Sequence, residues 1–235
     1  MSIRQVDNAP SHGRRRHGAL GLLAGLALTA FPAPVLAQDN PQVDVAGEPS
    51  TAEDRLILLH FSRCVAGRQP AQARALILGD YASEAYRDTL RRLTVSQHGC
   101  LPGGSGRLRF GGVLFAGDVA ETLLTAAAPR GSLAERTALN PAAAPFHAHD
   151  QGEVMSICVV RAVPAETEAL LATEQGSPEE AAALRAVAPH IGPCLAAGAA
   201  MRLNRPGLRA MLALTAYRLV QHNAGAAPAA AAAGN

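Results

Sequence analysis

The sequence contains no tryptophan and no lysine, and aromatic residues make up only 3% of its 235 positions. A core without many large rings must come from Leu, Ala, Val and Ile, which favours closely packed helices over a sheet. We therefore expect an all-α fold. No Cys-x-x-Cys pair occurs, which argues against a thiol oxidoreductase and against zinc held by closely spaced cysteines.

Long apolar runs are also scarce, and the longest lies at the start of the chain. Residues 1–37 have the pattern of a secretory signal peptide: a run of arginines at 14–16, an apolar region at 19–30, and Val35-Leu36-Ala37 before the cleavage point. The apolar region is shorter than the roughly 20 residues of a membrane span. We expect the mature chain to begin at Gln38, with a flexible segment over 38–50 and no membrane span.

Positive and negative charges nearly balance once residues 1–37 are removed. The whole chain has 21 arginines and 19 acidic residues, whereas residues 38–235 have 17 and 18, a net charge of −1. Nucleic-acid binding requires a basic surface. Nucleic acid is therefore not an expected partner.

The four cysteines indicate an internal repeat. Cys64 and Cys100 are 36 residues apart, as are Cys158 and Cys194, and a shift of 94 residues aligns the two segments with 11 identities over 38 positions. Besides the cysteines, the identical pairs are Val65 and Val159, Pro70-Ala71 and Pro164-Ala165, Ala75-Leu76 and Ala169-Leu170, Ser83 and Ser177, Leu90-Arg91 and Leu184-Arg185, and Leu101 and Leu195.

This alignment predicts two homologous helical repeats of about four helices each, over residues 51–130 and 151–223. Residues 131–150 form the linker between them, with a short helix after Ser132. The Ala-rich residues 224–235 have the composition of a disordered tail.

Helix starts are marked by hydroxyl residues and prolines. The Ser-Thr-Ala-Glu sequence over 50–53 reads as a capping box, Pro70 and Pro164 fit first helical positions, and Ser177 precedes a proline and two glutamates. We attribute Glu179 and Glu180 to this capping. We expect Asp118 and Glu121, one helical turn apart, to lie on an exposed helix face, and His60 to lie in or at the edge of the core.

Four cysteines in an exported chain favour a disulfide framework. Of the three possible pairings, the repeat favours Cys64–Cys100 and Cys158–Cys194, because an ancestral single copy had only two cysteines to pair. Each bond would tie the first helix of a repeat to the end of its third.

The repeated Cys-Val, Pro-Ala, Ala-Leu, Leu-Arg and Cys-Leu pattern resembles a family of uncharacterised small exported proteins of Gram-negative bacteria. The resemblance covers about residues 52–222. It implies the periplasm and implies no activity, substrate or catalytic residue.

Few residues suggest chemistry. His147, His149 and Asp150 form a His-x-His-Asp segment that could bind zinc or copper, but a solvated loop explains it equally well, and we expect no metal or cofactor. The sequence lacks a Gly-x-Ser-x-Gly elbow around a serine nucleophile. His98 and His190 are not equivalent under the 94-residue shift, which argues against a catalytic role inherited by duplication.

Three functional hypotheses follow. The first is a non-enzymatic binding or structural protein of the cell envelope, periplasmic or secreted, that contacts another envelope protein. The second is an enzyme or metal-binding protein with a site between the repeats, in which His147, His149, His190 and Glu121 would be tested first. The third is a carrier that holds an apolar small ligand in a groove between the repeats.

Overall fold

The computed structural model describes residues 43–44, 51–102, 110–126 and 131–225, and this part of the chain confirms the all-α fold. Its α-helices are α1 (Ala52–Arg68), α2 (Pro70–Leu78), α3 (Glu84–Val95), α4 (Gly112–Ala126), α5 (Leu133–Thr137), α6 (Gln151–Ala162), α7 (Pro164–Ala172), α8 (Pro178–Val187) and α9 (Arg205–Gly225). Short 3₁₀ helices are η1 (His98–Cys100), η3 (Ala188–His190) and η4 (Gly192–Cys194).

Strand structure in this part of the chain is limited to two short segments. β1 (Val43–Asp44) and β2 (Met201–Arg202) pair in parallel, with Val43 opposite Met201. The predicted signal peptide, the rest of the 38–50 segment and the tail beyond Gly225 lie outside the described residues. None of the helices described has the length and apolar character needed to cross a membrane.

Most helix starts follow the sequence signals. Pro70 and Pro164 are the first residues of α2 and α7, and Ser83 and Ser177 cap α3 and α8 through their side chains. The capping box of α1 is shifted by one residue from the prediction. Its cap is Thr51, whose hydroxyl accepts from the amide of Asp54 while the carboxylate of Asp54 accepts from the amide of Thr51.

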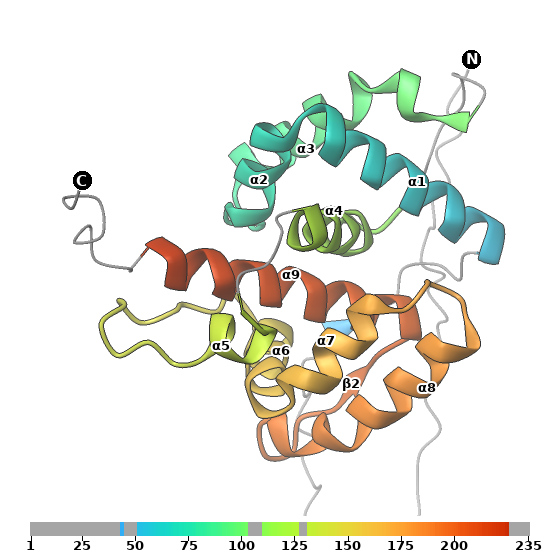
Figure 1. The fold of residues 1–235 in the computed structure, drawn as a ribbon. Coiled ribbons are helices and arrows are strands. Elements are labelled where there is room, and N and C mark those ends of the chain that lie inside the picture. The colour runs from blue at the N-terminus through green and yellow to red at the C-terminus, as the bar shows by residue number, and fades with distance from the viewer. Residues whose placement is uncertain (1–42, 45–50, 103–109, 127–130, 226–235) are drawn as a thin grey trace, which may run out of the picture. The chain divides into compact units, whose positions relative to one another are not determined.

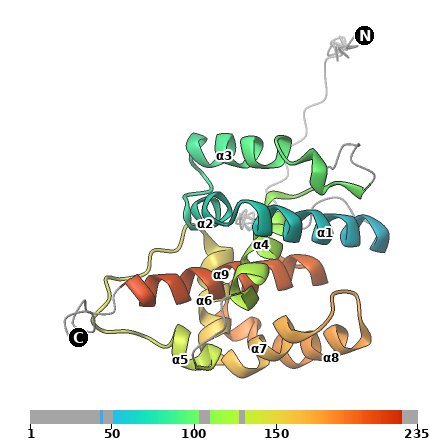
Figure 2. The same ribbon diagram turned by 45° about the horizontal axis from the view of Figure 1, so that its top comes forward.

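The helices of residues 51–225 lie in three layers, with α4 and α9 in the middle (Figures 1 and 2). Helices α1, α2 and α3 lie on one side of this pair, and α5, α6, α7 and α8 lie on the other. α9 is buried along most of its length, because it lies between the two outer layers. The core is mainly aliphatic, and its buried large rings are Phe61, Phe115 and Tyr217.

The two middle helices approach closely at Gly117 of α4. A methyl group at this position would overlap the main chain and the side chain of Ala210 in α9. Glycine is therefore required here for space, because any side chain would force the two helices apart.

Both disulfides have the expected pairing. Cys64 of α1 is bonded to Cys100 of η1, and Cys158 of α6 to Cys194 of η4, with Cα–Cα distances of 5.6 and 5.5 Å. Each bond therefore joins the first helix of its segment to the short turn after the third. None of the four cysteines is free.

The N-terminal half (α1–α4, Ala52–Ala126) and the C-terminal half (α6–α9, Gln151–Gly225) have matching helix spacing. α2 and α7 both have 9 residues and begin 94 residues apart, and η1 and η4 are separated by the same 94. The residues before α2 and α7 also have similar torsions, φ −132° at Gln69 and φ −135° at Val163.

Candidate functional site

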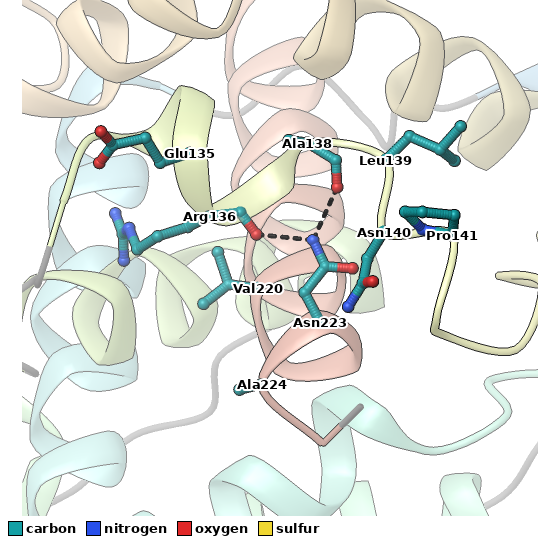
Figure 3. Close-up of a pocket in the computed structure, with 9 residues that line it drawn as sticks. All are labelled: Glu135, Arg136, Ala138, Leu139, Asn140, Pro141, Val220, Asn223 and Ala224. Atoms are coloured by element: carbon teal, nitrogen blue, oxygen red, sulfur yellow. Dashed lines mark hydrogen bonds between the residues drawn. The ribbon is translucent and has the colours of Figure 1, made fainter. Parts of the chain in front are cut away.

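A pocket of about 460 Å³ lies between the last turns of α9 and the loop that follows α5 (Figure 3). Apolar side chains line much of it, and Leu139 at this pocket is 74% exposed. The lining residues are Glu135, Arg136, Ala138, Leu139, Asn140, Pro141, Val220, Asn223 and Ala224.

The wall of this pocket is fixed by Asn223 of α9. Its side-chain amide donates to the carbonyl oxygens of Arg136 at 2.8 Å and Ala138 at 2.9 Å (Figure 3). These two bonds use both amide hydrogens and hold the end of α5 against α9. The start of α5 is fixed by a capping box between Ser132 and Glu135. The pocket is thus a preformed surface recess, which suits the anchoring of an apolar group.

A buried polar cluster joins the halves near the other end of α9, close to its start. We call it the Arg209 cluster, and its members are Arg55, Asp118, Glu121, Gln175, Glu180 and Arg209. Arg209, whose side chain is 1% exposed, donates from Nε and Nη2 to both oxygens of Glu121 at 2.9 Å and from Nη1 to Glu180 at 3.1 Å. Burial by itself would lower the pKa of Arg209, but Glu121 and Glu180 outweigh it and raise that pKa.

Arg209 also closes the end of a helix. Its Nη2 donates to the carbonyl oxygens of Leu171 at 3.3 Å and Thr173 at 2.8 Å, where α7 ends. The last carbonyls of a helix lack partners and carry partial negative charge, so a guanidinium is well placed there. A neighbouring pair completes the cluster: Arg55 donates to both oxygens of Asp118 at 2.7 and 2.5 Å.

The prediction that Asp118 and Glu121 lie on an exposed face is wrong. Asp118 is 1% exposed and Glu121 7% exposed. Their helix, α4, is buried between the outer layers, and two arginines from α1 and α9 pair with these acids. Capping alone does not account for Glu180, because its carboxylate accepts from the amide of Gly176 and from Arg209.

A second cluster, the Arg218 cluster, comprises Asp80, Tyr81, His149, Glu153 and Arg218. Arg218 donates to the carbonyl oxygens of Ile77 at 2.9 Å and Gly79 at 2.6 Å, where α2 ends, and to Glu153 at 2.6 Å. This is the same arrangement that Arg209 makes at the end of α7.

His149 lies at the edge of this cluster, with its side chain 27% exposed. Its Nδ1 is 2.7 Å from an oxygen of Glu153, its Nε2 is 3.8 Å from Asp80, and its ring lies 4.9 Å from that of Tyr81. Burial raises the pKa of Tyr81, and the neighbouring carboxylate of Asp150 raises it further. The cluster links the end of α2 to the start of α6.

The residues proposed for metal binding are not arranged as a ligand set. The carboxylate of Asp150 caps α6 by accepting from the amide of Glu153 at 2.8 Å, His149 faces Glu153, and His147 is exposed. Within the described ranges, no group of three or more His, Cys, Asp and Glu side chains could hold a metal ion.

The residues proposed for a catalytic site are separated among different environments. Glu121 belongs to the Arg209 cluster and His149 to the Arg218 cluster, while His190 lies in η3. His60 is exposed on α1, contrary to the expectation that it lies in or at the edge of the core.

Sequence reasoning missed the three buried arginines, Arg55, Arg209 and Arg218. Arg209 and Arg218 each stand between apolar residues of the largely buried α9, as in Leu208-Arg209-Ala210 and Tyr217-Arg218-Leu219, whereas Arg55 follows two acids at the start of α1. An arginine within such a segment is a signal for a buried ion pair, because a long charged side chain there must find partners. The pairing of Arg209 with Glu121 could not be predicted from the spacing of residues in the sequence.

Comparison with protein-family models, with curated proteins and with solved structures gave no match.

Proposed function

We propose that this protein is an exported, non-enzymatic binding protein of the cell envelope that contacts another envelope protein through the α5–α9 pocket. The observation that carries the proposal is the preformed pocket with the exposed Leu139. Binding hot spots are typically aromatic or arginine anchors that enter such recesses.

Export is supported by the disulfides. All four cysteines are paired, and disulfides persist in oxidising compartments such as the periplasm. The secretory pattern of residues 1–37 agrees with this. We accordingly place the mature protein in the periplasm or the medium.

We also propose that the two halves arose by duplication of one disulfide-bonded helical unit. The 94-residue alignment, the equal lengths of α2 and α7 and the equal positions of the two disulfides support this origin. The pocket is not part of the duplicated pattern, because it uses the α5 loop that joins the halves.

A partner protein fits the pocket better than an enclosed small molecule. Leu139 is 74% exposed, so the pocket is open to solvent at that residue. Enclosed ligand sites bury about 70–90% of a small molecule. A protruding apolar side chain from a partner protein would fill the recess and would also cover Leu139.

The test is photo-crosslinking in the native envelope. A benzoylphenylalanine is placed at position 139, and the control carries it at Val95, which is 58% exposed on α3. The proposal requires one protein to crosslink at position 139 and not at 95. That protein, once purified, must bind the wild type and bind an Ala224→Trp variant about tenfold more weakly, because the indole fills the pocket.

Equal crosslinking at both positions, or unchanged binding by Ala224→Trp, would contradict the proposal. An apolar small molecule that co-purifies with the wild type and is lost in Ala224→Trp would instead favour a carrier. Native mass spectrometry of the two proteins distinguishes these results.

A further inference from the structure

The two disulfides differ in their exposure to solvent, although their cysteines have the same separation in the sequence. Cys158 is exposed and its partner Cys194 is 9% exposed, whereas Cys64 is half-buried and Cys100 is 1% exposed. Loops of equal length give the two bonds equal chain-entropy contributions to stability. The rate of thiol–disulfide exchange, however, depends on access to a sulfur atom, so we expect the two bonds to differ in that rate.

An arginine covers the first disulfide. The guanidinium of Arg68 lies over Gly99, the residue before Cys100, because a methyl group added at Gly99 would lie 2.8 Å from Nη1 of Arg68. The equivalent positions in the C-terminal half, 94 residues later, are Ala162 and Pro193. The side chain of Ala162 ends at its methyl group and cannot extend over η4 as Arg68 extends over η1. The second disulfide is therefore without this cover.

The residues around the second disulfide leave it open to an approaching reagent. A methyl group added at Gly192, the first residue of η4, would meet no described atom within 4 Å. Pro193 is exposed, and so is Val154, one helical turn before Cys158 on α6. A nucleophile that breaks a disulfide attacks one of its sulfur atoms. The accessible sulfur for this attack is that of Cys158, and the leaving sulfur is that of the buried Cys194.

The charges near Cys158 favour an anionic nucleophile. The attacking species in disulfide exchange is a thiolate. Residues 154–162 contain one charged residue, Arg161, and residues 186–200 contain none. Arg161 donates from Nε to the carbonyl oxygen of Thr137 at 3.3 Å and makes no ion pair within the described residues. A thiolate that approaches along these two segments meets a positive charge and no carboxylate from them.

We propose that the Cys158–Cys194 bond is a site of thiol–disulfide exchange with an external dithiol, and that the Cys64–Cys100 bond is structural. A thiolate of the dithiol attacks Sγ of Cys158, a mixed disulfide forms, and the Cys158–Cys194 bond breaks. Cys194 leaves as a thiolate and takes a proton from water. The second thiol of the reagent then loses its proton and attacks the reagent's own sulfur in the mixed disulfide, which releases Cys158. The reagent is oxidised to a disulfide and the protein is reduced to two thiols.

Reduction at this site frees η4 from α6. The amides of Cys194 and Leu195 donate to the carbonyl oxygens of Ile191 and Gly192, which belong to the same short segment. The disulfide is the covalent connection between this segment and α6. Opening it loosens residues 188–200, which lead into β2. The inference does not depend on the α5–α9 pocket, because neither Cys158 nor Cys194 lines that pocket.

The test is timed reduction of the mature, oxidised protein by dithiothreitol under native conditions. Samples are alkylated with iodoacetamide at intervals, and the alkylated cysteines are quantified by peptide mass spectrometry. We expect the Cys158–Cys194 bond to open at least about tenfold faster than the Cys64–Cys100 bond. We also expect its rate to be proportional to the dithiothreitol concentration. Glutathione, which has a single thiol, should leave its adduct on Cys158 and not on Cys194.

Thioredoxin provides a second arm, because it presents a dithiol from a Cys-x-x-Cys protein. It is compared with dithiothreitol at equal thiolate concentration. Faster opening of the Cys158–Cys194 bond by thioredoxin identifies a protein dithiol as the reagent for this site. An equal or lower rate identifies a small-molecule thiol.

Arg68→Ala and Arg63→Ala test the cover over the first disulfide. Both arginines are exposed on α1, and each substitution removes one positive charge near Cys64, but it is Arg68 that lies over Gly99. We expect Arg68→Ala to speed the opening of the Cys64–Cys100 bond about threefold or more, and Arg63→Ala not to speed it. Melting temperatures measured in parallel separate a loss of cover from a loss of folding.

Three results would overturn the inference. The first is equal rates of opening for the two bonds, and the second is a glutathione adduct on Cys194. The third is a rate of opening that does not depend on the dithiothreitol concentration, because unfolding would then precede the attack. Each of these results leaves the crosslinking result at position 139 unaffected.

Discussion

The Arg209 cluster and the Arg218 cluster close equivalent helix ends in the two halves but are built with different chemistry. Arg209 donates to the carbonyl oxygens of Leu171 and Thr173, where α7 ends. Arg218 donates to the carbonyl oxygens at the end of α2, Ile77 and Gly79, which lie 94 residues earlier in the sequence. Arg209 pairs with two carboxylates. Arg218 pairs with Glu153, which also contacts the partly exposed His149.

This difference shows where the halves are alike and where they are specific. The outer helices and disulfides follow the same spacing, whereas the middle helices carry complementary charge. α4 supplies the acids Asp118 and Glu121, and α9 supplies both cluster arginines. Buried ions tolerate only a pairing that satisfies them, so these residues restrict how α4 and α9 can pack.

The largest expected effect comes from removing an arginine from each cluster. Arg209→Met should lower the free energy of unfolding by about 3–5 kcal/mol, because it leaves Glu121 and Glu180 buried without a counter-charge. Arg218→Met should lower the free energy of unfolding less, by about 2 kcal/mol, because His149 can still hydrogen-bond to Glu153. Denaturant unfolding of both variants measures the difference. Equal losses would show that the two clusters are energetically the same.

The disulfides should behave alike in the two halves. The paired changes Cys64→Ser with Cys100→Ser, and Cys158→Ser with Cys194→Ser, each open a loop with a separation of 36 residues. The chain-entropy model gives a loss of about 4 kcal/mol for either pair. Thermal and denaturant unfolding check both. Losses that differ by more than about 1 kcal/mol would mean that the halves respond differently despite equal loops.

A smaller effect is expected at the contact between α4 and α9. Gly117→Ala should cost about 2 kcal/mol, because the added methyl overlaps Ala210 and the helices must separate. Gly112→Ala is the control in the same helix, where the methyl would meet only Leu90 at ordinary distance. The comparison is made by denaturant unfolding. An unchanged free energy of unfolding in Gly117→Ala would show that α4 and α9 can make room for the methyl group.

The smallest effect concerns alkaline pH and the Arg218 cluster. Burial and Asp150 raise the pKa of Tyr81 above its ordinary value of 10.0. The folded state favours the neutral phenol. Its contribution to the free energy of unfolding is therefore complete below pH 10.0 and is lost as the pH rises towards the pKa of Tyr81 in the folded state. Tyr81→Phe should therefore lose less stability than the wild type between about pH 9 and about pH 11.

Tyr217→Phe provides the comparison, since burial also raises the pKa of Tyr217, which lies outside the Arg218 cluster. Unfolding midpoints in guanidinium chloride at each pH give the measurement. If Tyr81→Phe loses as much stability as the wild type over this range, the phenol of Tyr81 is not responsible for the alkaline loss.

Much of the scaffold could be predicted because its signals are local. A proline at the first position of a helix or a serine cap acts within one turn, so the starts of α2, α3, α7 and α8 follow from a few neighbouring residues. The disulfide pairing was predicted from the 94-residue alignment of the two cysteine pairs. The cap of α1 was displaced by one residue because Ser50-Thr51 and Glu53-Asp54 offer two overlapping registers.

The candidate sites could not be predicted in this way, because their residues are distant in sequence. The α5–α9 pocket joins the Ala138 loop to Asn223, and the Arg209 cluster joins Arg55 of α1 to Arg209 of α9. His149 was selected from a local His-x-His pattern, but its actual partners, Asp80 and Glu153, come from α2's end and from α6.

By itself, the sequence determined the helical class, the helix starts and the disulfide framework, because capping, apolar periodicity and cysteine spacing act over short or repeated distances. Only the tertiary structure decided that Asp118 and Glu121 are buried and that one helix carries both arginines that close α2 and α7. A charged side chain has the same local pattern whether it faces water or a partner, and its environment depends on which helices pack together.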